Sequence, residues 1–128
     1  SIQEQYAACC SEAEKHDKSA QVYEKLLNDE KLQWQQKIRY QNALADEYEK
    51  DDRPNKAADT RDELARSCEQ FIKDHPVGDR AMSARFTLAD AYAGAGRKDE
   101  ARRVLQGISD KYPDSSHAKQ AKEKMKKL

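Results

Sequence analysis

Three histidines and three cysteines are the side chains in this sequence best suited to metal or acid–base chemistry. His16, His75 and His117 lie far apart in the sequence, each beside a predicted helix end or turn. We expect surface histidines; the alternative is a metal ligand, because neutral imidazole commonly binds zinc. Cys9-Cys10 with His16 lacks the paired spacing of a zinc site. The sequence therefore predicts no metal site.

Motifs of catalysis are also missing from the sequence. It contains no Gly-rich loop ending in Gly-Lys-Ser/Thr, no His-Glu-x-x-His and no Gly-x-Ser-x-Gly. Paired acids such as Asp51-Asp52 and Asp46-Glu47 are explained by helix capping and solvation. We therefore predict no catalytic residues, no cofactor and a protein that is not an enzyme.

The cysteines do not form a disulfide framework. Cys9, Cys10 and Cys68 make an odd count, and neighbouring cysteines on one helix point about 100° apart, which is poor geometry for bonding each other. We expect free buried thiols that act as small apolar residues. A bridge from Cys68 to the N-terminal pair is the alternative, and the odd count weighs against an oxidising compartment.

Composition limits the fold class. Only 37% of the 128 residues are hydrophobic, and the mean hydropathy is −1.18. This is little apolar surface from which to build one large globular core. Tyr, Trp and Phe at ordered spacing argue against disorder. Stacked helix pairs fit best, because they bury a narrow continuous stripe and leave two solvated faces.

Charge and hydropathy bear on the class of partner. The 24 Lys and Arg balance the 24 Asp and Glu, so the net charge calls for neither nucleic acid nor an anionic membrane. No apolar run is long enough to span a bilayer, so no membrane insertion is expected. The chain begins at Ser1 without Met, and we expect a mature or excised fragment whose missing N-terminal part held a signal sequence or another domain.

Residues 85–113 predict a helix, a turn and a second helix. Apolar residues recur at helical spacing in both helices, at Leu88, Ala89, Tyr92, Ala101, Leu105 and Ile108. Gly94-Ala95-Gly96 between them can end the first helix in a left-handed conformation. Asp99 and Glu100 place negative charge in the first turn of the second helix, where the helix dipole favours it.

This unit resembles the tetratricopeptide repeat (TPR), a helix pair with the pattern W-x2-L-G-x2-Y, then A-x3-F, then P, over about 34 residues. The corresponding residues are Arg85 in place of Trp, Leu88, Ala89 in place of Gly, Tyr92, Ala101, Leu105 in place of Phe, and Pro113. A step of nine residues recurs in the chain, from Cys10 to Ser19, from Tyr48 to Ala57 and from Tyr92 to Ala101.

The recurring pattern sets the expected helices. The first runs from Ser1 to about Ala13, and the second starts near Asp17. The next two run from Glu30 to Lys50 and from about Pro54 to Asp74. The two helices of residues 85–113 and a last helix follow them. Asp51-Asp52 and Asp79 are expected to cap the helices after them, and Asp114 and Ser115 the last one. The helix to Asp74 exceeds its counterpart by roughly two turns, and we expect its extra end to be solvated, with a local binding ledge as the alternative.

The resemblance implies an all-α fold, a right-handed α-solenoid of about three TPR-like hairpins plus a C-terminal capping helix. We predict a single TPR-like domain over residues 1–128. Its parts are repeat 1 at about 1–30, repeat 2 at about 31–76 with a lengthened second helix, repeat 3 at about 78–113, and the capping helix at about 114–128. The segments KDHP and DKYPDSSHAKQAKEKMKKL are similar to bacterial cell-envelope TPR proteins of the BamD and YbgF/CpoB type.

The resemblance also implies a site. In a TPR stack, residues next to the Leu and Tyr packing positions of each first helix point into a concave groove that binds a partner's peptide or helix. Those positions are Glu4, Ala8, Arg39, Asn42, Asp46, Glu49, Phe86 and Asp90. We expect a single exposed Phe86 among mixed charges. The acidic members would repel an acidic C-terminal peptide, so the set does not match the Lys/Asn carboxylate clamp of chaperone-binding TPR proteins.

These features favour a non-enzymatic protein–protein interaction scaffold in a bacterial envelope-associated assembly, in the periplasm or at the envelope. A cytoplasmic adaptor, or a module that self-associates into a homo-oligomer, is the alternative. A third hypothesis is contact with nucleic acid or anionic lipid through six lysines after residue 110, where the local charge is about +4. Cations that cap a helix explain those lysines too, and we expect no nucleic-acid partner.

Overall fold

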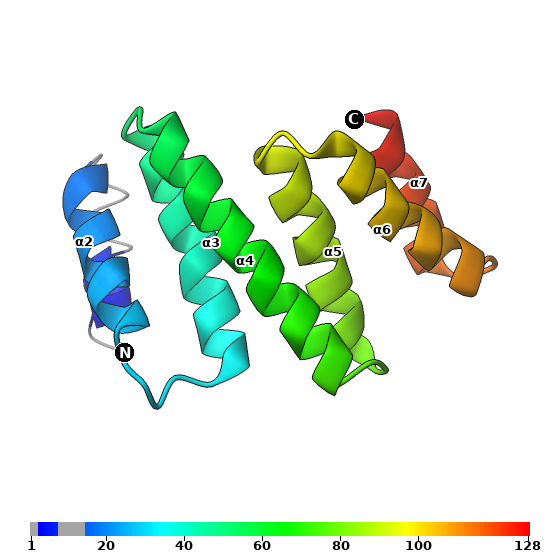
Figure 1. Cartoon of the computed structure of the whole chain (residues 1–128), viewed down its shortest axis with the longest axis horizontal. Coiled ribbons are helices and arrows are strands. Elements are labelled where there is room, and N and C mark those ends of the chain that lie inside the picture. Colours follow the sequence, from blue (N-terminus) through cyan, green and yellow to red (C-terminus); the bar gives the residue numbers. More distant parts are fainter. Residues whose placement is uncertain (1–2, 8–14) are drawn as a thin grey trace. The chain divides into compact units, whose positions relative to one another are not determined.

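The computed structural model describes residues 3–7 and 15–128, and all regular secondary structure in them is α-helical (Figure 1). Residues 3–7 are helical, and the longer helices are α2 (His16–Leu27), α3 (Trp34–Lys50), α4 (Pro54–Asp74), α5 (Asp79–Gly94), α6 (Lys98–Lys111) and α7 (Ser116–Lys126). The predicted all-α class is confirmed for this part of the chain. The handedness of the solenoid, the number of repeats and the repeat boundaries stay predictions.

Two compact units make up the chain, an N-terminal unit, Ser1–Leu64, and a C-terminal unit, Ala65–Leu128. The division falls inside α4. Within the N-terminal unit α2 packs along α3, and within the C-terminal unit α6 packs against both α5 and α7 (Figure 1). No described helix is long and apolar enough to cross a membrane.

The core of the N-terminal unit contains buried side chains from α2, α3 and α4, namely Ala20, Leu44, Tyr48 and Ala57, with Tyr23 and Leu27 packed against them. Ser19 of α2 is also fully buried, and its hydroxyl donates a hydrogen bond to the Ala7 carbonyl oxygen at 2.9 Å. A buried hydroxyl needs such a partner. Ser19 therefore fills the small-residue position expected from the nine-residue step without leaving a polar group unsatisfied.

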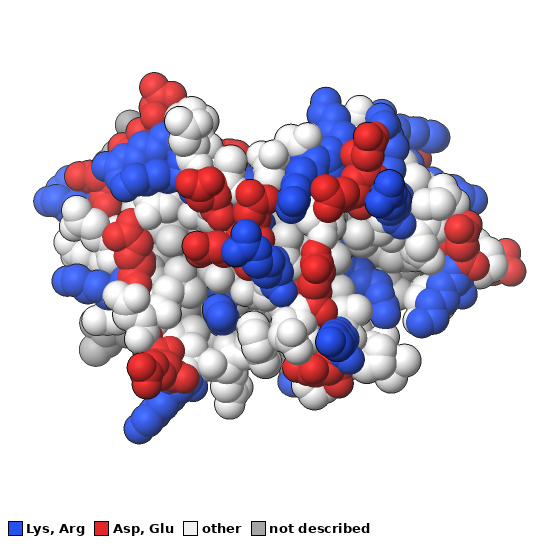
Figure 2. Space-filling model, viewed as in Figure 1, with Lys and Arg blue, Asp and Glu red and all other residues white. Residues whose placement is uncertain are grey.

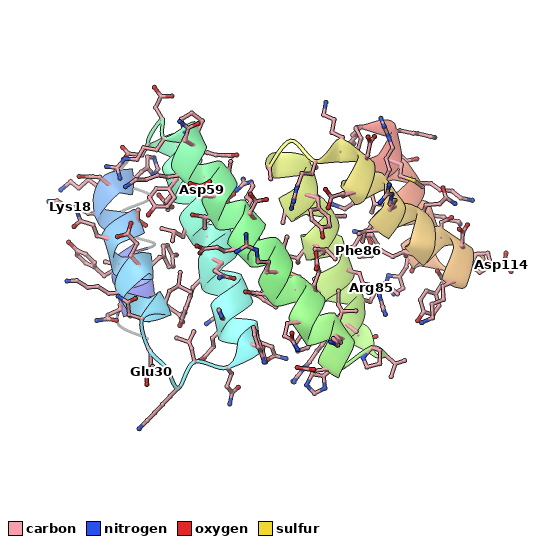
Figure 3. The ribbon with its side chains drawn as sticks, viewed as in Figure 1. Lys18, Glu30, Asp59, Arg85, Phe86 and Asp114 are labelled. Carbon is pink, nitrogen blue, oxygen red and sulfur yellow. The ribbon has the colours of Figure 1, made fainter. Side chains whose placement is uncertain are left out.

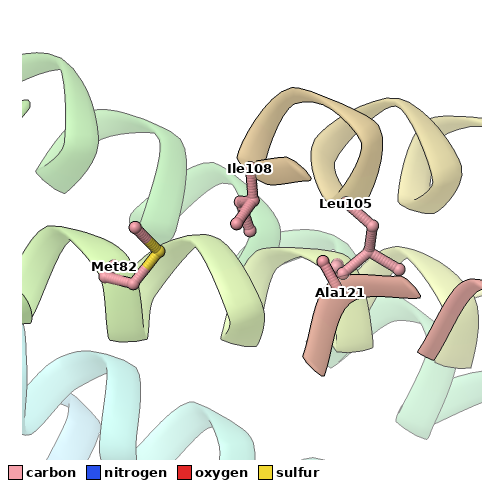
Figure 4. Packing of buried hydrophobic residues seen from close by; sticks show 5 residues of the cluster. Met82, Leu105, Ile108 and Ala121 are labelled. Carbon is pink, nitrogen blue, oxygen red and sulfur yellow. The ribbon is translucent and has the colours of Figure 1, made fainter. Parts of the chain in front are cut away.

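One cluster of buried apolar side chains in the C-terminal unit lies between α5, α6 and α7 (Figure 4). The buried members are Met82, Ala89, Leu105, Ile108 and Ala121, and Phe86, Val104, Tyr112, Met125 and Leu128 pack around them half-buried. The small Ala89 and Ala121 let neighbouring helices approach closely. The apolar stripes expected on these helices are confirmed.

The start of α3 differs from the prediction. The helix begins at Trp34 rather than Glu30, because the chain turns at Asp29. The Asp29 carboxylate accepts a hydrogen bond from the Lys31 backbone N–H at 3.0 Å, and the Asp29 carbonyl accepts one from the Leu32 N–H at 3.2 Å. An aspartate that binds nearby backbone offers the chain an alternative to the helix, which delays its start.

Two of the expected helix caps are also wrong. Asp79 is the first residue of α5, and Gly78 precedes it with φ of 104°, a conformation that favours glycine. The Asp79 carboxylate therefore lies in the first turn and interacts with the helix dipole rather than capping. At α7 it is Ser115, not Asp114, that caps the helix, since the Ser115 hydroxyl accepts a hydrogen bond from the Ala118 N–H at 3.1 Å.

The C-terminal end of α5 is a Schellman motif. The Arg97 N–H donates to the Tyr92 carbonyl oxygen at 2.7 Å, and the Gly96 N–H donates to the Ala93 carbonyl oxygen at 3.1 Å. Gly96 has φ of 83°, the left-handed conformation this motif requires. The glycine predicted to end this helix does so.

The C-terminal end of α3 repeats that motif without a glycine. The Arg53 N–H donates to the Tyr48 carbonyl oxygen at 2.8 Å, and the Asp52 N–H donates to the Glu49 carbonyl oxygen at 3.1 Å. Asp52 takes the left-handed position, with φ of 56°. It therefore terminates α3 instead of capping α4, and Asp51 also does not precede the helix directly, so the cap expected from Asp51-Asp52 is wrong.

Substitutions at the two left-handed positions, Gly96 and Asp52, are expected to change the free energy of unfolding in opposite directions. Gly96→Ala should lower the free energy of unfolding by about 1 kcal/mol, because a Cβ is disfavoured in the left-handed region. Asp52→Gly should raise it by about 0.5 kcal/mol, since aspartate tolerates that region better than alanine but worse than glycine. Urea denaturation followed by circular dichroism measures both, and a change of the same sign in the two variants would contradict the account.

Candidate functional site

The predicted groove residues fall into separate groups. Ala8 lies outside the described residues, and Asn42 is exposed on α3. In the N-terminal unit Glu4 contacts Arg39, while Asp46 and Glu49 both contact Arg61. In the C-terminal unit Phe86 and Asp90 line one hollow.

Glu4 is engaged by two side chains of α3. The Arg39 guanidinium donates a hydrogen bond to the Glu4 Oε1 atom at 2.7 Å, and the Tyr40 hydroxyl donates to the same oxygen. The Tyr40 hydrogen bond is the main cause that lowers the pKa of Glu4, and the charge of Arg39 adds to it. The carboxylate is therefore ionised at neutral pH and holds residues 3–7 against α3.

Asp46 and Glu49 are both bound by Arg61 of α4, which sequence reasoning missed. The Arg61 Nη2 atom lies 3.2 Å from Asp46 Oδ1 and 3.0 Å from Glu49 Oε2, and the Arg61 side chain is only 11% exposed. Arg61 follows Ala57 by four residues, where the other unit has Leu105 after Ala101. That break in the A-x3-F pattern could have indicated a special role, because a partly buried arginine needs carboxylate partners.

A hollow of about 410 Å³ lies between α5 and α7, and we call it the α5–α7 hollow. It is lined by Asp79, Met82, Ser83, Phe86, Thr87, Asp90, His117, Gln120 and Lys124. From Asp79 to Asp90 it follows three turns of α5, a rise of about 16 Å. It brings together two of the predicted groove residues.

Phe86 lies in this hollow but is half-buried, so the expected exposed phenylalanine is corrected. Its ring packs on the core of the C-terminal unit and lies 6.1 Å from the His117 ring, centroid to centroid. One part of the ring thus stabilises the fold, while another faces the hollow. Side chains with this double role are well placed as anchors for a partner, because they are already held rigid.

Asp90 pairs with Lys124 across the same hollow, where the Lys124 Nζ atom lies 3.0 Å from Asp90 Oδ1. Lys126 pairs with Glu123 at 3.6 Å. Two of the six C-terminal lysines thus have carboxylate partners within the chain. Both explanations of the lysine cluster, helix capping and a nucleic-acid or lipid contact, stay predictions.

The histidines are more buried than expected. The His16 Nδ1 atom lies 2.6 Å from Glu47 Oε2, with side chains 16% and 6% exposed. His117 is half-buried beside Phe86, and only His75 is exposed. Surface positions were therefore wrongly predicted for His16 and His117, because the first turns of α2 and α7 pack against neighbouring helices. Among residues 3–7 and 15–128, no group of three or more His, Cys, Asp or Glu could hold a metal ion.

Two tyrosines at equivalent positions bind glutamates of the preceding helix, which the sequence did not predict. The Tyr48 hydroxyl donates a hydrogen bond to Glu24 of α2, and the Tyr92 hydroxyl donates one to Glu69 of α4. Burial and the Glu24 hydrogen bond raise the pKa of Tyr48. These hydroxyls therefore tie each first helix to its predecessor and have a structural role.

Cys68 is a free thiol, fully buried on α4, as predicted. Burial raises the pKa of this thiol to about 12. Cys9 and Cys10 lie outside the described residues. Cys68 therefore acts as a small apolar residue rather than a nucleophile.

Comparison with known proteins agrees with the helix-pair pattern of the C-terminal unit. Residues 81–125 match the model of the tetratricopeptide repeat family, a segment that covers most of α5, all of α6 and α7 to Met125. No curated protein matches the chain. The match supports a TPR protein, and TPR repeats generally mediate protein–protein interaction and are typically non-enzymatic. The closer similarity to the BamD and YbgF/CpoB type stays a prediction.

Proposed function

We propose that the chain is a non-enzymatic protein–protein interaction scaffold. It binds a peptide or helix of a partner protein on the face lined by the first helix of each repeat. In the C-terminal unit this face is the α5–α7 hollow. On the similarity of its C-terminal segment to envelope TPR proteins, we also propose a bacterial envelope-associated assembly as its setting. A cytoplasmic adaptor is the alternative.

One observation carries the proposal, the combination of Phe86 with the polar rim of the α5–α7 hollow. Protein-binding pockets pair an apolar anchor with a few polar groups that fix orientation. Phe86 provides the apolar surface, while the exposed Ser83 and Gln120 provide hydrogen-bonding groups beside it. The Asp90–Lys124 pair presents both signs of charge, which suits a partner segment of mixed composition.

Affinity capture tests this proposal. The immobilised chain is exposed to separate envelope and cytosolic extracts of the source cell, and its captured proteins are compared with those of Phe86→Ala and Ser83→Arg. Phe86→Ala removes the anchor, and Ser83→Arg blocks the hollow from an exposed position without touching the core. We expect both variants to lose the same partner, with at least about tenfold less captured, a loss of about 1.4 kcal/mol.

Val77→Ala is the matched control, because Val77 is an apolar side chain of the same unit that is 73% exposed and lies outside the α5–α7 hollow. Its capture should equal that of the unaltered chain. If every partner stays bound to both hollow variants, the proposed face is wrong. Capture from the cytosolic extract alone would overturn the envelope setting and leave the binding face supported.

A further inference from the structure

A second hollow, which we call the basic hollow, lies on another face of the C-terminal unit, among α4, α5 and α6. Its volume is about 320 Å³. It is lined by Ile72, Arg85, Leu88, Arg103, Val104, Gly107, Ile108, Lys111 and Tyr112. None of these residues lines the α5–α7 hollow, so the two sites can be altered independently.

The lining combines an apolar surface with positive charge. Arg85, Arg103 and Lys111 are its only charged residues, and no Asp or Glu is among the lining side chains. Figure 2 shows uncharged surface between α5 and α6, with both basic and acidic side chains around it. Three cations around an apolar surface without a lining carboxylate attract a ligand that is both apolar and acidic.

Arg85 is held in place by the chain itself (Figure 3). Its Nη2 atom donates a hydrogen bond to the Pro76 carbonyl oxygen at 2.7 Å. Its Nη1 atom is buried and has no hydrogen-bond partner among the described residues. No carboxylate of the described residues pairs with this guanidinium, and carboxylates are the groups that match its geometry.

Gly107 indicates that the hollow is kept open. It lies inside α6, where glycine is a poor helix former compared with alanine. A Cβ built at Gly107 would meet nothing within 4 Å, so close packing of another helix does not explain the glycine. Because Gly107 lines the basic hollow, its missing side chain leaves room for a ligand to approach the helix backbone.

We propose that the basic hollow is a second docking site, for an acidic segment of a partner protein in which an aliphatic or aromatic side chain lies beside Asp or Glu. The apolar side chain occupies the hollow, which is larger than the cavities of about 150 Å³ that hold benzene. The carboxylates pair with Arg85, Arg103 and Lys111. A nucleic-acid backbone would satisfy the cations but leave the apolar surface unfilled.

The first test measures binding of a fluorescein-labelled peptide, Gly-Ser-Glu-Glu-Leu-Phe-Glu-Glu-Ser-Gly amide, to the full chain by fluorescence anisotropy. Two further peptides replace either all Glu by Lys or both Leu and Phe by Gly. We expect the acidic apolar peptide to bind at least about tenfold more tightly than either of the others. Equal binding of the three peptides would overturn the proposal.

Gly107→Leu and Gly107→Ala separate docking from folding. Both should raise the urea midpoint, because both residues are better helix formers than glycine. Gly107→Leu fills the hollow and should weaken peptide binding at least about tenfold, whereas the small Gly107→Ala should keep most of it. Unchanged binding to a folded Gly107→Leu would overturn the assignment of the hollow.

Charge reversal provides the second test. Arg103→Glu with Lys111→Glu alters exposed residues of the basic hollow, and Lys119→Glu with Lys122→Glu makes the same change in net charge on α7. Only the first pair should weaken binding about tenfold and reduce its salt dependence. An equal loss in both pairs would overturn the proposal, as would tighter binding of phosphatidylserine vesicles or a single-stranded oligonucleotide than of the peptide. Phe86→Ala should bind the peptide normally, which separates this site from the α5–α7 hollow.

Discussion

Leu105→Ala is expected to lower the free energy of unfolding by about 2–5 kcal/mol, because it leaves a cavity in the core of the C-terminal unit. Leu105 is 1% exposed and is among the largest fully buried side chains in the described part of the chain. Urea denaturation followed by circular dichroism measures the loss. A small domain has only about 5–15 kcal/mol of stability in total, so the variant should be close to unfolding at moderate temperature.

Val104→Ala is the control for this prediction. Val104 is the neighbouring residue on α6, but it is half-buried and borders the basic hollow. Removing two methyl groups from a half-buried position should cost about 1 kcal/mol or less. Equal losses in Leu105→Ala and Val104→Ala would contradict the placement of Leu105 in the core.

Cys68 is expected to react with iodoacetamide at least about a thousandfold more slowly in the folded protein than in concentrated urea. Burial raises the pKa of its thiol from 9.0 to about 12, which reduces the reactive thiolate at neutral pH by that factor. Complete burial also keeps the reagent out. Peptide mapping by mass spectrometry separates the labelling of Cys68 from that of Cys9 and Cys10, and rapid labelling of Cys68 under native conditions would contradict the burial.

The raised pKa of Cys68 also determines how the stability of the fold depends on pH. Because the folded pKa lies above the unfolded one, the unfolded state releases the thiol proton first as the pH rises. The stability linked to Cys68 is therefore fully present below about pH 9 and is lost as the pH rises toward about 12. Tyr48, whose pKa is also raised, acts in the same direction. Labelling of Cys68 should accordingly accelerate at alkaline pH.

Packing positions could be predicted from the sequence because they follow the helix period. Tyr48 and Tyr92 are both buried, as are the alanines nine residues after them. The spacing fixes which face of each helix points inward, and small residues on that face determine how closely helices pack. The nine-residue step also predicted that Ser19 takes the position of these alanines, although its hydrogen bond to Ala7 could not be foreseen.

The candidate site was less predictable because its partners come from distant parts of the sequence. Asp46 and Asp90 were treated as groove side chains available to a ligand, yet Arg61 and Lys124 bind them within the chain. Helical periodicity gives the direction of a side chain but not the long cation that reaches it from another helix. The start of α3 was wrongly predicted for a local reason, because the Asp29 carboxylate competes for backbone N–H groups.

Photocrosslinking from within the α5–α7 hollow tests the proposed binding face most directly. A photoreactive phenylalanine analogue replaces Gln120, an exposed residue of the hollow, or Val77, which is exposed outside it. We predict a covalent adduct with a partner protein from position 120 that is absent from position 77 and disappears when Phe86→Ala is added. An adduct from position 77 alone, or one from position 120 that survives Phe86→Ala at full yield, would contradict binding at this face.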